Sequence, residues 1–330
     1  MSKFYVESKE ELQILITNAA GKLGTSEAVV EKDYWVSFIL DYLFNQNRWK
    51  DAFTFKGGTS LSKCYGLIER FSEDIDLILD WRVLGYSKDE PWASRSNTQQ
   101  DKFNKEVNLK TENFLKDVFI KELEKDFKKL YKVEIRFFLD AEDSKSIRVE
   151  YPIAFSSAYL TQTIKMEIGS FAAWTPAIET EIEPIISKMY PKLFKGKSCI
   201  RTVSPERTFW EKATILHHEA NRPKALYMPV RHARHYYDLY EMSNTYVKDL
   251  AFSNRELLKK VTKFKMKFYP RGWARYEDVL DGKLRLVPDN FRFAEIEKDY
   301  DAMKEMIYGE TPSFDEIMKS LTNLENEINM

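Results

Sequence analysis

Hydrophobic and polar positions recur along this chain with two different periods. Apolar residues return every three or four positions in residues 9–21 and 101–131, which is typical of helices that bury one face, whereas those of residues 27–44 spread widely around a helix that should be largely buried. Residues 132–139 and 163–169 alternate with a period of two, as half-buried strands do. These patterns therefore predict both helices and strands in the N-terminal half of the chain.

The rest of the chain predicts helices. Residues 175–203 contain three prolines and have no clear period, so we place a domain boundary near residue 200. Beyond it, Ser204-Pro205 and Pro229 mark the starts of two helices. The expected domains are residues 1–200 and 201–330.

The composition fits a folded protein of the cytoplasm. With 330 residues, of which 43% are hydrophobic and 14% aromatic, the chain can bury the cores of about two domains. Its formal net charge of −1 excludes a uniformly basic nucleic-acid binder, although not a local basic patch. The two cysteines give no disulfide framework. The sequence shows neither an apolar signal core nor a stretch of ~20 apolar residues, so we expect a soluble, cytoplasmic protein without a membrane partner.

The strongest chemical pattern is KGGTSLSKCYGLIERFSEDIDLIL, residues 56–79. We expect it to follow a strand and to begin with a sharp turn and a short helix. Paired glycines let the backbone approach a bulky anion, and a helix N-terminus offers it free N–H groups. The pattern thus predicts a phosphate cradle formed by Gly57, Gly58, Thr59 and Ser60.

Asp74 and Asp76 stand in a second run with a period of two. Their carboxylates point to one side of a strand, about 7 Å apart, while Ile75 and Leu77 point to the other. Two carboxylates so placed repel each other unless a cation lies between them, and Mg²⁺ favours one or two carboxylates plus substrate phosphates. The alternative is that both aspartates are solvated residues of an edge strand.

The glycine turn and the aspartate run together resemble the signature of the DNA polymerase β-like nucleotidyltransferase superfamily. More closely, KGGTSL with RFSEDIDL is similar to the AbiEii/AbiGii family of nucleotidyltransferase toxins, which belong to type IV toxin–antitoxin and abortive-infection systems. EKDYWV before these motifs, and SPERTFWEK and RHYYDLYEM after them, extend the resemblance over most of the chain.

The resemblance implies a fold and an activity. The fold would be α+β, with a polymerase β-like core of a mixed sheet flanked by helices and a helical C-terminal domain that completes the active site. The activity would be transfer of a nucleotide from an NTP, with Mg²⁺ held by Asp74 and Asp76. The acceptor would be the 3′ end of tRNA, and the partner a cognate antitoxin. Rival hypotheses are transfer to a small molecule or a protein, and an RNA-binding protein that kept the fold without catalysis.

The resemblance also assigns site residues outside the turn. Ser72 would contact the nucleotide, and Glu167 would be a third carboxylate that activates the attacking hydroxyl. Lys212 would contact the triphosphate, and Asp238 corresponds to an essential aspartate of the family. Asp238 could orient Lys212 or accept a proton.

Each of these residues also has a structural alternative. Glu167 could pair with a lysine or arginine of a neighbouring strand. Lys212 lies on a mostly apolar helix face and could extend to its edge instead of into a pocket. Asp238 could form a surface ion pair with Arg234, worth only ~0.3–0.5 kcal/mol.

Three further clusters have less specific chemistry. Residues 255–275 combine basic and aromatic side chains, which suits either an RNA strand or a solvated helix with a buried aromatic stripe. Glu31, Lys32 and Asp33 are expected to pair with neighbours around the site. The four histidines do not favour a zinc site, because adjacent histidines cannot share a helix face and no cysteine is nearby.

Overall fold

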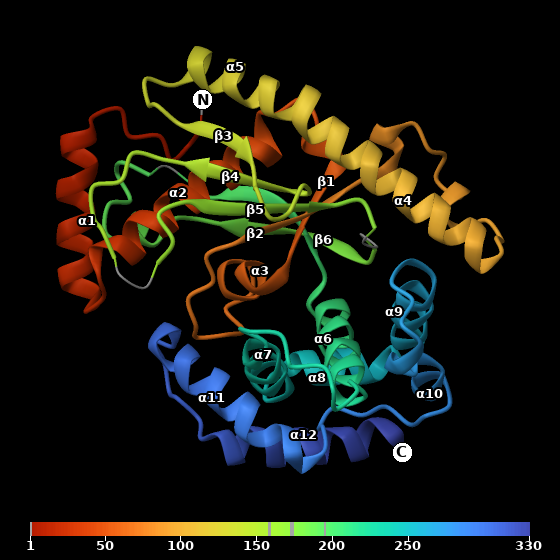
Figure 1. The fold of residues 1–330 in the computed structure, drawn as a ribbon. Coiled ribbons are helices and arrows are strands. Elements are labelled where there is room, and N and C mark those ends of the chain that lie inside the picture. Colours follow the sequence, from red (N-terminus) through yellow and green to blue (C-terminus); the bar gives the residue numbers. More distant parts are fainter. Residues whose placement is uncertain (1, 158–159, 172–174, 195) are drawn as a thin grey trace. The chain divides into compact units, whose positions relative to one another are not determined.

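The computed structural model describes residues 2–157, 160–171, 175–194 and 196–330 (Figure 1). The chain divides into two compact units. The first contains Met1–Cys64 and Glu73–Val203, and the second contains Tyr65–Ser72 and Ser204–Met330. The second unit therefore includes one short segment that lies, in the sequence, between the glycine turn and the aspartates of the first.

A mixed sheet forms the centre of the first unit. Its strands are Phe53–Lys56 (β1), Ile75–Leu79 (β2), Arg136–Leu139 (β3), Ser146–Glu150 (β4), Ile164–Gly169 (β5), Ala177–Ile182 (β6) and Ser198–Val203 (β7). Their order is β3-β4-β5-β2-β1-β7-β6, so β2 lies in the middle. β2 runs antiparallel to β1 and parallel to β5.

Helices flank the sheet where the apolar periods predict them (Figure 1). They are Lys9–Leu23 (α1), Glu27–Asn45 (α2), Gly57–Lys63 (α3), Asn97–Phe114 (α4) and Ile120–Leu130 (α5). The side chain of Ser26 caps α2 by accepting the N–H of Val29, and every residue of α2 from Val30 to Phe44 is buried. α2 shares one apolar core with Phe55, Ile75 and Leu77 of the sheet.

Two predicted boundaries in this unit differ from the structure. The helix expected over residues 101–131 starts earlier, at Asn97, because Ser96 and Gln99 form a capping box there. It continues into α5 through a π-helical turn at Leu115–Phe119. The strand expected over residues 132–139 is confirmed only from Arg136, and the residues before it connect α5 to the sheet.

The second unit is helical. Its helices are Pro205–Ala220 (α6), Ala233–Ser243 (α7), Tyr246–Ser253 (α8), Arg255–Phe268 (α9), Tyr276–Leu280 (α10), Phe293–Met303 (α11) and Phe314–Asn329 (α12). Backbone hydrogen bonds attach Tyr65–Ser72 to this unit, from Phe71 N–H to Met306 O (2.7 Å) and from Tyr308 N–H to Glu69 O (2.9 Å). The predicted α+β fold is confirmed by the sheet and its flanking helices.

The predicted helix start at Pro229 is wrong, because α7 begins four residues later. Arg231 has a left-handed backbone (φ 60°), which a continuing helix cannot contain. The Asp299 carboxylate accepts the N–H groups of Arg231 and Ala233, both at 2.7 Å, and so fixes the first turn of α7 at Ala233. By contrast, the predicted start of α6 at Ser204-Pro205 is confirmed.

None of the helices in the described parts of the chain is both long and apolar enough to cross a bilayer.

Candidate active site

Strand β2 turns its two acidic residues away from the core. Ile75 and Leu77 are fully buried against α2, whereas Asp76 and, one residue before the strand, Asp74 are partly exposed on the opposite side. This is the predicted alternation. The edge-strand alternative is wrong, because β1 and β5 pair with the two sides of β2.

Glu167 lies directly beside Asp76. The parallel register of β2 and β5 pairs Asp76 with Glu167, and the antiparallel register of β1 and β2 pairs Asp76 with Lys56. Paired residues of neighbouring strands extend from the same face of a sheet, with backbones about 5 Å apart. Asp74, Asp76 and Glu167 therefore share one face of the sheet.

Lys165 is the internal counter-ion of this face. Its Nζ donates to Glu167 Oε1 at 2.6 Å and lies 3.5 Å from Asp143 Oδ2. Burial would lower the pKa of Lys165, but the hydrogen bond with Glu167 and the charges of Glu167, Asp143 and Asp74 raise it. Glu167 thus pairs with a lysine of its own strand, not of a neighbouring one, and almost half of its side chain stays exposed.

The glycine turn lies against Asp76. Gly57 has a left-handed backbone (φ 83°), and a Cβ at Gly57 would overlap Asp76 Oδ2 and lie 2.7 Å from Asp76 Cγ. Only glycine lets the turn come this close to the carboxylate. In the sequence, Asp74, the first aspartate of the motif, lies 17 positions after Gly57. The structure brings the turn into contact with the second aspartate, Asp76.

Two hydroxyls of the predicted cradle are turned inward. Thr59 and Ser60 are buried in α3, and Ser60 Oγ donates to Gly57 O at 2.8 Å, which closes the turn. Ser72 is half-buried and ends the segment that belongs to the second unit. Of the cradle, the Gly57 backbone lies against the Asp76 carboxylate.

Gly57→Ala is expected to cost more stability than a glycine replacement with the same backbone strain. Gly24→Ala is the matched control, since Gly24 also has a left-handed φ (64°) but no atom within 4 Å of an added Cβ. Gly24→Ala should lower the free energy of unfolding by about 1–2 kcal/mol, and Gly57→Ala by about 1–3 kcal/mol more. Urea unfolding of both variants measures the difference, and equal losses would contradict the contact between Gly57 and Asp76.

The EKD cluster of α2 pairs with neighbours, as predicted. Glu31 accepts the N–H groups of Ala154 (2.9 Å) and Phe155 (3.3 Å). Lys32 is fully buried and donates to Glu73 Oε2 at 2.6 Å, while Asp33 forms an ion pair with Lys63. The Lys32 pair holds the residue next to Asp74, and the Asp33 pair holds the end of α3, so the cluster supports both halves of the motif.

Within the second unit, Lys212 and Asp238 form one buried ion cluster. Lys212 Nζ donates to Asp238 Oδ2 at 2.7 Å and lies 3.0 Å from His235 Nδ1. Arg70 forms a bidentate pair with the same carboxylate, at 2.7 Å from Nε to Oδ1 and 2.9 Å from Nη2 to Oδ2. Lys212 does not extend to the surface, and Asp238 is fully buried instead of forming a surface pair with Arg234.

The pKa values of Asp238 and Lys212 are both lowered in this cluster. Burial would raise the pKa of Asp238, but the charges of Arg70 and Lys212 outweigh it and lower that pKa. The pKa of Lys212 is also lowered, first by burial and then by the charges of Arg70 and Arg234, despite its bond to Asp238. Both shifts agree with an excess of cations over anions in the cluster, because nearby positive charge favours the ionised carboxylate of Asp238 and disfavours the charged ammonium of Lys212.

The basic and aromatic residues of α9 separate into two faces. Phe264 and Phe268 are buried in the second unit, so they are part of its core and not a platform for bases. Lys259, Lys260 and Lys263 are exposed. These two aromatic residues are thus structural, while Lys260 and Lys263 are exposed cations and Lys259 pairs with Glu256 at 2.5 Å.

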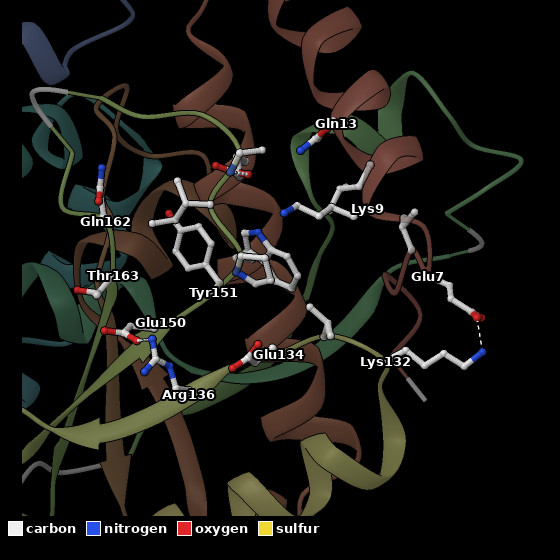
Figure 2. Close-up of a pocket in the computed structure, with 18 residues that line it drawn as sticks. Glu7, Lys9, Gln13, Lys132, Glu134, Arg136, Glu150, Tyr151, Gln162 and Thr163 are labelled. Carbon is white, nitrogen blue, oxygen red and sulfur yellow. Dashed lines mark hydrogen bonds and ion pairs between the residues drawn. The ribbon is translucent and has the colours of Figure 1, made fainter.

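A cavity of about 660 Å³ lies in the first unit, between α1, α2 and the β3–β4 hairpin (Figure 2). Trp35 and Tyr151 stack in its wall, with ring centroids 5.7 Å apart. Its other lining residues include Glu31, Arg136 and Glu150, but none of the predicted site residues. None of its lining residues belongs to β2 or to the glycine turn, so we do not assign this cavity to the candidate site.

The acidic face fits a divalent cation that is held largely by its substrate. The described residues contain no group of three or more His, Cys, Asp or Glu side chains arranged to hold a metal ion. Mg²⁺, however, is usually bound through one or two carboxylates together with phosphate oxygens and water. The carboxylates that share this face, and a turn too close to Asp76 for any side chain at Gly57, suit that kind of site.

Two residues of the site escaped the sequence analysis. Lys165 lies two positions before Glu167, and the period of the strand could have placed it on the acidic face. Arg70 had no such signal, because its partner Asp238 is 168 residues away in the chain.

Comparison with known proteins gives a family match over most of the chain. A family model described as nucleotidyl transferase AbiEii toxin, type IV TA system, matches residues 39–320. No protein with a curated description matches the sequence. Among solved structures, the nucleotidyltransferase toxin MenT4 of Mycobacterium tuberculosis H37Rv is similar, at 17% identity and a TM-score of 0.45, with 96% of each chain covered. A candidate nucleotidyltransferase from H. pylori has 16% identity and a TM-score of 0.44, covering 92% of this chain and 96% of its own.

Proposed function

The chain belongs to the AbiEii family of nucleotidyl transferase toxins of type IV toxin–antitoxin systems, and from this we propose that it transfers a nucleoside monophosphate from an NTP to the 3′ end of tRNA, with Mg²⁺. The family implies an NTP substrate and a cognate antitoxin. The observation that carries the proposal is the contact between Gly57 and the Asp76 carboxylate. The contact supports a site in which the turn would bind phosphate and the carboxylates would bind a cation.

Asp74 and Asp76 are the residues that would hold Mg²⁺. The bound ion would neutralise charge on the triphosphate and orient the reacting phosphate. The backbone of the Gly57–Ser60 turn and the Lys212 ammonium would bind the phosphates, since both provide N–H donors. Transfer then consists of attack by the acceptor hydroxyl on the α-phosphorus, with pyrophosphate as the leaving group.

Of the two residues considered for accepting the hydroxyl proton, we propose Glu167. It lies beside Asp76 and is partly exposed, so an acceptor can reach it. Asp238 is fully buried, already accepts hydrogen bonds from Arg70 and Lys212, and has a lowered pKa, which makes it a weak base. We propose Asp238 as a positioning residue that fixes Lys212.

An RNA acceptor is supported by the surface of the second unit. Lys260 and Lys263 are exposed cations one turn apart on α9, beside Lys259, which pairs with Glu256. Such cations bind a nucleic-acid backbone through its phosphates without reading its sequence. A small-molecule acceptor would have no need of them.

The activity is expected to depend on both the tRNA 3′ hydroxyl and the metal. Purified protein is incubated with a tRNA pool and each labelled NTP in turn, with Mg²⁺. We expect at least one NTP to label intact tRNA, and periodate-oxidised tRNA, which lacks the 3′ hydroxyl, to stay unlabelled. EDTA should abolish labelling and excess Mg²⁺ should restore it, because the carboxylates alone leave the triphosphate charge uncompensated. Labelling that persists in EDTA would contradict the metal, and unlabelled tRNA with every NTP would contradict the acceptor.

A further inference from the structure

A small cavity in the second unit has walls rich in arginine. Its volume is about 100 Å³, which is room for about three water molecules. Arg70, Arg231 and Arg234 line it together with Asp299 and three apolar residues between positions 302 and 306. Arg70 is buried, Arg234 half-buried and Arg231 exposed, and an anion among their side chains would relieve the repulsion between three like charges.

The anions in and around the cavity are already engaged. Both oxygens of Asp299 accept backbone N–H groups, from Arg231 and Ala233. Asp238 is bound by Arg70 and Lys212. Within the described part of the chain, the Arg234 guanidinium has no hydrogen bond or ion pair. Arg70, Arg231, Arg234 and Lys212 outnumber Asp238 and Asp299, so positive charge is in excess here. Burial first, and then the charges of Lys212, His232, Arg234 and Arg70, lower the pKa of the nearby His235 well below the ordinary value.

The backbone around the cavity is strained in a way that presents an arginine to it. Arg231 has φ 60°, a conformation that costs about 1–2 kcal/mol for a residue with a side chain. Asp299 holds that conformation through the N–H of Arg231. Strain that the surroundings maintain is found where a side chain must be aimed at a ligand.

We propose that this cavity is a binding site for a single phosphoryl group. Arg234 and Arg231 provide the donors, because planar guanidinium groups bind phosphate oxygens in pairs. Arg70, saturated by Asp238, adds only its charge. The ligand is the terminal phosphate of the nucleotide or a phosphodiester of the acceptor, and this biological assignment rests on the proposed function, whereas the phosphate chemistry does not.

The test is titration with inorganic pyrophosphate, followed by calorimetry, without metal. Arg231→Ala and Arg234→Ala are each expected to weaken binding at least about tenfold. Arg234→Lys keeps the charge but loses the paired geometry, so its affinity should fall between those of the wild type and Arg234→Ala. Arg285→Ala is the control, since it removes a cation of the same unit that pairs with Asp289 outside the cavity. Unchanged melting temperatures would show that the variants are folded.

The outcomes separate the site from the proposed function. Absence of pyrophosphate binding by the wild type, wild-type affinity in both alanine variants, or an equal loss in Arg285→Ala would overturn the site. A KM for NTP that is raised in Arg231→Ala and Arg234→Ala would identify the nucleotide as the source of the phosphate. A plot of log tRNA affinity against log salt concentration whose slope is about one unit less steep in these variants than in the wild type would instead identify the acceptor as the source. Both of these results support the site. Failure of the wild type to label tRNA would remove the proposed function but leave the pyrophosphate titration intact.

Discussion

Asp76→Asn is expected to lower the rate of nucleotide transfer by about 10²–10³-fold or more, the size of effect seen when a preorganised charge is removed from an active site. Asp76 lies between Lys56 and Glu167 in the sheet and against the glycine turn, so its carboxylate faces both proposed ligands. Stability should change by less than about 1 kcal/mol, because Asp76 is only partly buried and partly exposed ion pairs contribute little. Single-turnover labelling of tRNA measures the rate, and urea unfolding measures the stability.

Glu150→Gln is the matched control for Asp76→Asn. Glu150 is a carboxylate of the same sheet, on β4, and pairs with Arg136 at 2.8 Å on the surface. It lies on the same face of the sheet as Glu167, but four residues along β4 from Ser146, the residue that pairs with Glu167, and it lines the cavity of the first unit. Its replacement should leave the transfer rate within about twofold, since exposed ion pairs contribute little. Wild-type transfer by Asp76→Asn would remove Asp76 from the site and with it the proposed mechanism.

Asp238→Asn is expected to destabilise the protein by about 3–5 kcal/mol, because it leaves the buried cations Arg70 and Lys212 without their carboxylate. Adding Lys212→Met should recover part of that loss, since it removes one uncompensated charge. Transfer should be lost in both variants. The free energy of unfolding in urea at pH 7 gives the size of each effect.

The same variant changes how stability depends on pH. Since the pKa of Asp238 is lower in the folded protein than the ordinary carboxyl value, its contribution is complete above about pH 4 and is lost as the pH falls toward the folded pKa. Asp238→Asn should therefore flatten this part of the acid unfolding curve. An unchanged curve would mean that Asp238 is not paired in the folded state.

Glu241→Gln, on the same helix, is a control in which the pKa of the replaced carboxyl is shifted in the opposite direction. Burial and then the charge of Glu69 raise the pKa of Glu241 to about 7. A carboxyl whose pKa is raised on folding weakens the folded state once it ionises, so stability falls as the pH rises from about 4.5 to 7. The glutamine variant should be at least as stable as the wild type at pH 8. A loss similar to that of Asp238→Asn would point to general disruption of α7.

The acidic face of the first unit and the ion cluster of the second unit differed in how well the sequence predicted them. The glycine turn and Asp76 belong to one strand–turn–helix–strand motif, so their spacing and alternation already fixed their faces. Glu167 was placed on a face but not beside Asp76, because register between strands far apart in the sequence depends on the whole sheet. The pairing of Asp238 with Arg70, and the arginine cavity, had no sequence signal.

By itself the sequence determined the local periods, the helix caps, the side of β2 that carries the aspartates and the resemblance to the AbiEii family. These properties depend on neighbours within a few residues, where propensity and alternation act directly. The tertiary structure alone decided the central place of β2, the inclusion of Tyr65–Ser72 in the helical unit and the partners of Asp238. They depend on how distant segments bury their apolar faces and buried charges together, and a linear pattern does not encode that choice.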